Sequence, residues 1–172
     1  MSSFSANVAA AAISARPLVH APQGLRFVET SMVDKLPVVQ ELMREHWEEL
    51  VLDAKAMPLR LDEARYRGLE AAGILLCIVA YDGDQIVGYS VGVLFNHPHH
   101  GDVRTLSNDS LFLSKPYRKG LNGVGLMRAT EAAAARHGAA MITWNAEPGT
   151  SLESLLPALG YAPMNTLYGK GI

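Results

Sequence analysis

The residues best suited to chemistry lie between positions 111 and 126, where a short apolar run leads into a turn that carries Arg118. Gly120, Gly123 and Gly125 would let the backbone of this turn pass close to a ligand. The helix expected to follow offers unpaired N–H groups and the positive end of its dipole, and both attract anions. Because several donors converge over several ångströms, a diphosphate suits the turn better than a carboxylate does.

Spacing separates this turn from other glycine-rich turns. The chain has no G-x-x-x-x-G-K-[ST] and no G-x-G-x-x-G, so a P-loop and a dinucleotide fingerprint are both excluded. What remains is Arg118 five residues before Gly123, with an Ala-rich helix to follow. This pattern resembles the GNAT superfamily of acyl-CoA-dependent N-acyltransferases, whose pyrophosphate loop reads [RQ]-x-x-G-x-[GA]. Leu121 replaces the middle glycine of that pattern, and Gly120 stands one residue earlier.

The resemblance covers residues 25–172. Residues 97–120 are similar to a bacterial and phage-borne GNAT subgroup, in which a His-containing hairpin loop precedes the fourth strand. Residues 159–170 are similar to its last two strands, which begin at a Gly-aromatic pair and end at Tyr-x-Lys. The resemblance implies a mixed α/β sandwich of the α+β class, with a mostly antiparallel sheet flanked by helices, and acetyl-CoA as co-substrate.

Bulk composition narrows the class of protein. With 172 residues, of which 49% are hydrophobic, the chain is expected to form one domain. A net charge of -2 and no Lys/Arg-rich run give no electrostatic footprint for nucleic acid or an anionic membrane. No apolar run approaches the roughly 20 residues of a membrane span. Cys77 is the only cysteine, which excludes an internal disulfide, so we expect a cytoplasmic protein.

The first 24 residues differ in composition from the rest. They are rich in Ser and Ala and lack the charged start of a signal peptide. We therefore expect residues 1–24 to be a flexible tail or a docked extension, and residues 25–172 to be the acyltransferase domain. A homodimer is compatible with this organisation.

Hydrophobic periodicity predicts two helices after a first strand at 25–30. The first helix is expected to begin at Asp34 as N-cap, with Pro37 in its tolerated first turn. The second is expected to begin at Asp62 and to end at Gly73. The buried stripe of the first helix would consist of Leu36, Val39, Met43, Trp47 and Leu50.

The rest of the chain predicts a meander followed by alternating elements. A strand at 74–81, the turn Asp82-Gly83-Asp84 and a strand at 85–95 form a hairpin. One face of the second strand would carry Val87, Tyr89, Val91, Val93 and Phe95. The predicted elements that follow are a fourth strand at 109–113, a helix at 122–137, a strand at 140–145, a helix at 151–159 and a hairpin at 161–170.

Acyl transfer to an amine needs a site for CoA and a donor to the developing oxyanion. The resemblance implies that backbone N–H groups of the glycine turn contact the pyrophosphate, and that the N–H of Leu113 serves the oxyanion. An ordinary glycine-rich helix start is the alternative interpretation. The predicted acyl-CoA-binding residues are Leu111, Phe112, Leu113, Arg118, Lys119, Gly120, Leu121, Asn122, Gly123, Val124 and Gly125.

The amine must also lose a proton, because its pKa lies near 10. Asp109 matches the place where many GNAT proteins carry a Glu that acts directly or through water. Strand alternation would put Asp109, Leu111 and Leu113 on one face, with the acid at the cleft. A solvated acid at the start of a strand is the alternative.

Two family positions are replaced here. Leu156 stands where the family often has a Tyr that protonates the thiolate, and Gly149 stands where an Asn is often found. Either the thiolate leaves unaided, or the hydroxyl of Tyr161 or Tyr168 substitutes. We therefore expect an N-acetyltransferase that works in a ternary complex on a small-molecule or protein amine. The alternative is a non-catalytic acyl-CoA-binding or protein-interaction module.

Two charged or ligating clusters remain. His97, His99 and His100 lack a carboxylate or thiolate at a recognisable spacing, so we predict no metal site. The subgroup resemblance implies instead that their loop rims the acceptor pocket. The first helix also carries an acidic face that either steers a cationic amine or is simply solvated. This face consists of Glu41, Glu45, Glu48, Glu49 and Asp53.

Overall fold

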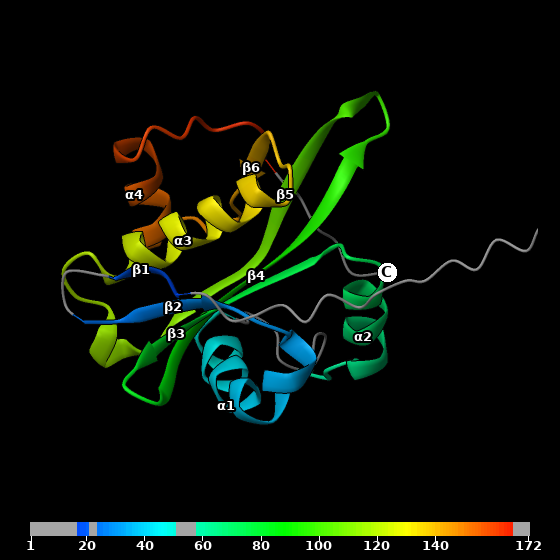
Figure 1. Ribbon diagram of the computed structural model, residues 1–172. Coiled ribbons are helices and arrows are strands. Elements are labelled where there is room, and N and C mark those ends of the chain that lie inside the picture. Colours follow the sequence, from blue (N-terminus) through cyan, green and yellow to red (C-terminus); the bar gives the residue numbers. More distant parts are fainter. Residues whose placement is uncertain (1–16, 21–23, 51–57, 167–172) are drawn as a thin grey trace, which may run out of the picture.

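The computed structural model describes residues 17–20, 24–50 and 58–166. One six-stranded sheet runs in chain order, β1-β2-β3-β4-β5-β6, and every neighbouring pair is antiparallel except the parallel pair β5–β6. This mixed sheet with flanking helices confirms the predicted fold class (Figure 1). The elements are β1 (Pro17–His20), β2 (Arg26–Glu29), α1 (Met32–Leu50), α2 (Glu63–Ala71), β3 (Leu75–Asp82), β4 (Gln85–His97), β5 (His100–Leu113), a 3-10 turn (Lys115–Tyr117), α3 (Asn122–Arg136), β6 (Met141–Thr143) and α4 (Ser151–Ala158).

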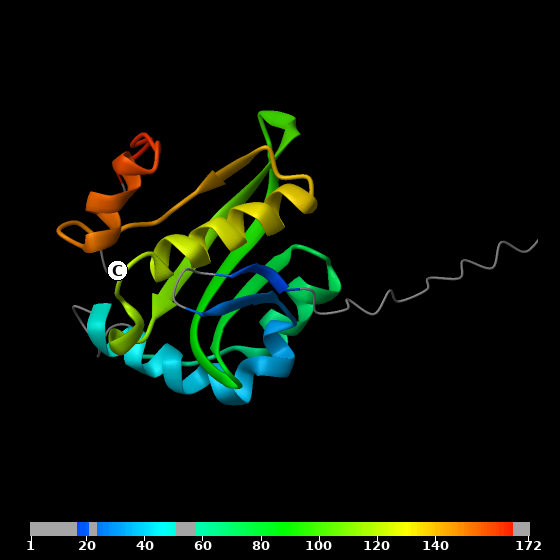
Figure 2. The ribbon, with the colours of Figure 1, turned by 60° about the vertical axis from the view of Figure 1, so that its left-hand side comes forward.

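The sheet has a hydrophobic core on each face, and different helices cover the two faces (Figures 1 and 2). In β3, Leu76 and Ile78 pack in the core that contains α3, while Cys77 and Val79 pack in the core that contains α1. This alternation follows from the period of two in a strand. Cys77 is buried against Met32, and burial raises the pKa of its thiol to about 12.

The start of α1 differs from the prediction. The helix begins at Met32, and the hydroxyl oxygen of Ser31 accepts the N–H of Asp34 at 3.1 Å, so Ser31 is the N-cap. The carboxylate of Glu70 in α2 accepts the backbone N–H groups of Met32 and Val33. Asp34 as N-cap was therefore wrong, and Pro37 lies one turn deeper in the helix than expected.

Other local predictions are confirmed. Asp62 caps α2 by accepting the N–H of Arg65 at 2.9 Å, and Gly73 follows the helix with a φ of 66°. The α3 helix begins at Asn122. In the predicted stripe of α1, Leu36, Val39 and Met43 are buried and Trp47 is half-buried, while the side chain of Leu50 lies outside the description.

Besides a register shift at Asn96/His97 near the hairpin turn, two irregularities break the expected alternation on β4 and β5. Tyr81 pairs with Ile86 and Ala80 pairs with Gly88, which leaves Val87 as an extra residue. Val87 consequently packs in the core on the α3 face, whereas Tyr89 packs in the core on the α1 face. The prediction that both share one face was wrong, and Phe95 at the end of β4 is exposed.

The second irregularity lies at Asp109. Ser110 pairs with Val91 and Asn108 pairs with Gly92, so Asp109 is the extra residue of the bulge. The predicted alternation of Asp109 with Leu111 and Leu113 is therefore interrupted. The side-chain amide of Asn108 holds the bulge by donating to the carbonyl oxygens of Val91 at 3.1 Å and of Ser110 at 3.2 Å.

The strands β5 and β6 share only a short ladder. Residues 105–107 of β5 pair with residues 141–143 of β6. Beyond them β5 continues to Leu113 without a β6 partner. The amide of Asn145 donates to the carbonyl oxygen of Asn108 at 2.6 Å at the point where the two segments part. Beyond this point one edge of β5 is not covered by β6 (Figure 2).

Several outer elements also have bounds that the sequence analysis did not give. Pro17–His20, within the segment expected as a tail or docked extension, forms edge strand β1 beside β2. The fourth strand begins at His100 instead of residue 109, and β6 is shorter than 140–145. Residues 161–166 form no strand, in line with the missing N–H of Pro163, and the rest of the predicted last hairpin lies outside the described residues. Within the described ranges, no helix is long and apolar enough to cross a membrane.

Candidate active site

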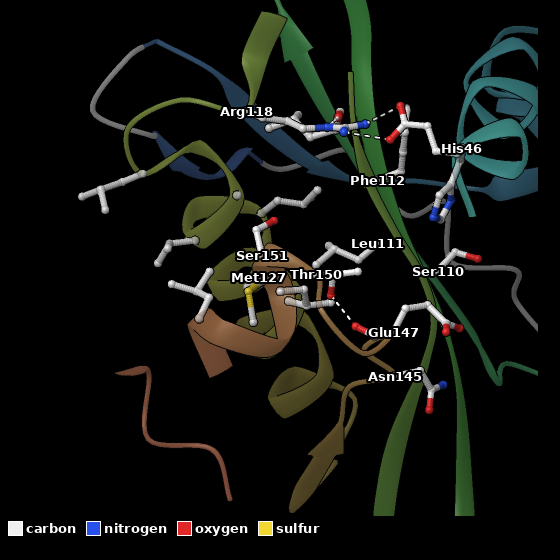
Figure 3. A pocket seen from close by; sticks show the side chains of 18 of the residues that line it. His46, Ser110, Leu111, Phe112, Arg118, Met127, Asn145, Glu147, Thr150 and Ser151 are labelled. Carbon is white, nitrogen blue, oxygen red and sulfur yellow. Dashed lines mark hydrogen bonds and ion pairs between the residues drawn. The ribbon is translucent and has the colours of Figure 1, made fainter. Parts of the chain in front are cut away.

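A cavity of about 540 Å³ opens where β5 continues beyond β6 (Figure 3). One wall is the end of β5, and another is the turn at 118–121 with the first turns of α3. The third wall comes from Asn145, Glu147 and the first residues of α4. Of the residues predicted to bind acyl-CoA, nine line this cavity. They are Leu111, Phe112, Leu113, Arg118, Lys119, Gly120, Leu121, Gly123 and Val124.

The start of α3 leaves donors facing this cavity. Leu121 is the N-cap and makes no side-chain cap. Within the described part of the chain, the N–H groups of Gly123 and Val124 have no hydrogen-bond acceptor, and both residues line the cavity. Gly120 supports the turn with a φ of 56°, a conformation that residues other than glycine rarely adopt. Free N–H groups at the positive end of a helix are suited to an anion, and binding of a diphosphate at this turn stays a prediction.

Asn122 and Gly125 support the turn without lining the cavity. Asn122 is buried, and its side-chain amide donates to the carbonyl oxygen of Tyr117 at 3.0 Å. The N–H of Gly125 donates to the carbonyl oxygen of Leu121 at 2.8 Å. Their assignment as ligand-binding residues stays a prediction, because the structure places them behind the lining residues.

Arg118 points across the cavity toward α1 (Figure 3). Its guanidinium forms two hydrogen bonds with the carboxylate of Glu49, lies 5.0 Å from the ring centre of Phe112 and donates through Nε to the carbonyl oxygen of Leu113. Hydrogen bonding to Arg118 lowers the pKa of Glu49 below its ordinary value. The neighbouring Lys119 is exposed at the cavity wall and makes no ion pair with a described residue.

Pairing geometry sets the direction of the Leu113 backbone. Leu113 lies opposite Gly88, and the N–H of Ser114 donates to the carbonyl oxygen of Val87 at 2.9 Å. Because N–H groups alternate in direction along a strand, the N–H of Leu113 points away from β4, to the edge that β6 does not cover. This direction suits the role in oxyanion binding that the sequence resemblance implies.

His46 of α1 is a wall residue that sequence analysis missed. Its Nδ1 lies 2.8 Å from the hydroxyl of Tyr89, and its ring stacks on Phe112 with 4.9 Å between centroids. Burial lowers the pKa of His46, so the imidazole is neutral near pH 7. Burial also raises the pKa of Tyr89, which stays a phenol. The sequence feature that could have indicated His46 is its position three residues after Met43, beside the apolar stripe of α1.

Asp109 lines the cavity from the bulge of β5. It is exposed, and the hydroxyl of Ser110 donates to its carboxylate at 3.0 Å. Its charge acts on His46, where it raises the pKa against the larger lowering by burial. The carboxylate is thus placed beside a neutral imidazole, and its catalytic role stays a prediction.

Tyr161, one of the two tyrosines proposed as proton donors, does not line this cavity. Tyr161 donates to the carboxylate of Glu131 on α3 and lies edge-on to Trp144. Burial raises its pKa to about 12. Tyr168 lies outside the described residues, and Leu156 does not line the cavity. The hydroxyl of Tyr161 is therefore engaged elsewhere in this structure.

The acidic face of α1 is largely used by internal contacts. Glu41 pairs with Arg44, Glu45 accepts the hydroxyl of Ser114 at 3.0 Å, and Glu49 holds Arg118. Asp53 lies outside the described residues. These contacts favour an internally paired helix face over a free surface that steers cations.

The histidine loop lies at the β4–β5 turn. The N–H of His99 donates to the ring of His97 at 3.2 Å, and both residues are exposed. Among the described residues, no group of three or more His, Cys, Asp or Glu side chains is placed to hold a metal ion.

Comparison with known proteins decides the fold. No family model and no curated protein matches the sequence. An aminoglycoside acetyltransferase from an uncultured soil metagenomic sample matches at a TM-score of 0.70 and 16% identity, over 87% of this chain and 99% of the other. The chain has the GNAT fold.

Two further GNAT neighbours cover the same region. A second aminoglycoside acetyltransferase from an uncultured soil metagenomic sample, in complex with sisomicin, has a TM-score of 0.68 at 14% identity, over 86% of this chain and 96% of the other. Ribosomal-protein-alanine N-acetyltransferase from Brucella melitensis biovar Abortus 2308 has a TM-score of 0.65 at 14% identity. The match covers 87% of this chain and 99% of the other. These GNAT neighbours are acetyltransferases, and at such identities the likeness concerns the fold.

Proposed function

We propose that the protein is an acetyl-CoA-dependent N-acetyltransferase in which a primary amine attacks the thioester directly in a ternary complex. The observation that supports this most is the start of α3, where the N–H groups of Gly123 and Val124 face a cavity without an acceptor among the described residues. Such donors at the positive end of a helix suit the diphosphate of CoA. The acceptor would be an amine on a small molecule or a protein.

The chemical step needs few groups. The amine nitrogen attacks the thioester carbonyl carbon, and the N–H of Leu113 donates to the oxyanion that develops. The carbon–sulfur bond then breaks and the thiolate leaves. A thiol pKa of about 8.5 makes the thiolate a competent leaving group without a protein acid, so the replacement of the family Tyr by Leu156 is tolerated.

His46 is the better proton acceptor of the two candidate bases. A general base works best when its pKa lies near the operating pH, and imidazole is the side chain whose ordinary pKa lies nearest to neutral pH. His46 is neutral near pH 7, so its ring can take the amine proton at Nε2 when Nδ1–H donates to Tyr89. Asp109 would hold the incoming ammonium beside it.

The alternative is a non-catalytic acyl-CoA-binding module or protein-interaction domain. It is favoured by one observation: among the described residues that line the cavity there is no tyrosine to protonate a thiolate. Binding of acetyl-CoA without turnover would support it.

A thiol-release assay tests the proposal. Acetyl-CoA is mixed with the full-length protein and a panel of amines, polyamines, aminoglycosides, amino acids and lysine peptides, while calorimetry measures acetyl-CoA binding. We expect binding and amine-dependent release of CoA. Binding without CoA release in the presence of any amine would support the non-catalytic module. Absence of acetyl-CoA binding would exclude both the transferase and the acyl-CoA-binding module.

A further inference from the structure

A second cavity, of about 400 Å³, lies on the α2 side of the sheet. It is bounded by α2, by the residues that precede this helix, and by β3, β4 and β5. Its inner wall is apolar and includes Leu69, Leu75 and Val91. Its volume falls within the range of small-molecule sites, about 300–1,000 Å³.

The cavities on the two sides of β5 share Asp109, which lines both. The bulge at this residue is the cause, because an extra residue re-aims a side chain that regular alternation would confine to one face. A ligand held in the second cavity can therefore reach the carboxylate of Asp109. That carboxylate also borders the cavity proposed for acetyl-CoA.

The exposed rim of the second cavity carries two cations. Arg60 and Arg65 both line it, and neither guanidinium forms an ion pair within the described part of the chain. The carboxylate of Asp62, which also lines the cavity, accepts the N–H of Arg65 as the cap of α2. Guanidinium groups bind carboxylates through two parallel hydrogen bonds.

Tyr66 adds a neutral donor to the same wall. Burial raises the pKa of its phenol, so the hydroxyl keeps its proton across the physiological range. The cavity thus presents positive groups at its rim, an apolar body and a carboxylate at Asp109. This arrangement is complementary to a small zwitterion.

We propose that this second cavity holds the acceptor, and that the acceptor is a small amino-acid-like amine with an apolar body. Its carboxylate lies on Arg60 and Arg65, and its ammonium lies on Asp109. This inference rests on the proposed transferase function and adds the substrate class.

The test compares each amino acid with its decarboxylated partner. Phenylalanine is paired with phenethylamine, and leucine is paired with isoamylamine, in the thiol-release assay. We expect kcat/KM about tenfold higher for the member that carries the carboxylate, as loss of a charge-assisted contact predicts. Arg65→Gln and Arg60→Gln should each bring the ratio toward one while acetyl-CoA affinity stays unchanged.

Arg67→Gln is the matched control. Arg67 lies on the same helix, is exposed, pairs with Glu63 and does not line the cavity. It should leave the carboxylate preference intact. Equal use of both members of each pair, or equal loss of preference in Arg67→Gln, would overturn the proposal.

Failure of the transferase function is distinguishable from failure of this inference. If no amine releases CoA, calorimetry with the CoA-saturated protein compares binding of phenylalanine and phenethylamine directly. If phenylalanine binds more tightly than phenethylamine and Arg65→Gln removes this difference, the carboxylate site is supported even though the protein does not catalyse the transfer. Equal binding, or no binding of either compound, rejects the carboxylate site.

Discussion

Arg118 holds Glu49 through two hydrogen bonds, Nη1 to Oε2 at 2.8 Å and Nη2 to Oε1 at 2.9 Å. This pair joins the turn before α3 to the end of α1, and both residues line the larger cavity. A carboxylate therefore faces the site proposed for a diphosphate. Any polyanion bound there has to share Arg118 with Glu49 or displace Glu49 from it.

Replacement of this carboxylate should tighten CoA binding. In Glu49→Gln the side chain keeps its size but loses the charge that repels phosphate, so we expect the Kd of acetyl-CoA to fall about twofold to fivefold at low salt. Calorimetry measures the change. Glu48→Gln, on an exposed residue of the same helix that does not line the cavity, should leave the Kd unchanged. Weaker binding in Glu49→Gln would mean that the ion pair is needed to position Arg118.

Gly123→Trp should abolish acetyl-CoA binding and leave the protein folded. A Cβ at Gly123 meets no heavy atom within 4 Å, and its φ is not in the left-handed region, so the fold accepts a side chain there. The indole would fill the space in front of the free N–H groups. Calorimetry and thermal unfolding together check the two halves of this prediction.

Ala132→Trp is the control for that variant. Ala132 is exposed on the same helix and does not line the cavity. It should bind acetyl-CoA like the parent protein. Unchanged affinity in Gly123→Trp would show that the turn is not the binding site.

The pH dependence should report His46. Burial lowers its pKa, so the neutral form persists below 6.5, and the acid limb of kcat/KM should lie below pH 6.5. The free energy of unfolding should change in the same direction. As the pH falls through 6.5, the unfolded chain takes up the proton before the folded chain does, so the folded state loses stability. His46→Gln should lower kcat about 100-fold and remove the limb.

Asp109→Asn separates the two candidate bases. If Asp109 only holds the ammonium, the variant should lower kcat/KM, keep the acid limb of His46 and leave acetyl-CoA affinity unchanged. Disappearance of the limb in Asp109→Asn, with its persistence in His46→Gln, would make Asp109 the base.

Glu70→Gln should destabilise the fold. The carboxylate caps the first turn of α1 from α2 and also accepts the hydroxyl of Ser31 at 2.9 Å. A charged cap at a helix start contributes about 1–2 kcal/mol, so Tm should fall by about 2–8 °C. Glu63→Gln removes only an exposed pair with Arg67 and should change Tm little. Calorimetric unfolding of both variants measures the difference.

Features set by neighbours in sequence were predictable. Asp62 and Gly73 bound α2 because capping depends on residues within the same turn. The turn before α3 and the start of this helix follow from the glycines at 120 and 123 and from the periodic apolar residues after Asn122.

Features set by distant side chains were not predictable. The cap of α1 depends on Glu70, which comes 38 residues after Met32. The bulge at Asp109 depends on Asn108, whose amide reaches a carbonyl on another strand. Alternation within one strand carries no sign of such contacts, so the access of Asp109 to the second cavity could not be predicted. His46 was missed for the same reason, since its partners Tyr89 and Phe112 lie on other elements.

The buried thiol on β3 offers a way to time the opening of this domain. Cys77 is 2% exposed and is the only cysteine in the chain, so an alkylating reagent reaches it only when the central strands separate. The rate of labelling therefore reports rupture of the sheet interior. Slower modification in the presence of acetyl-CoA would measure how strongly an occupied cavity restrains that rupture.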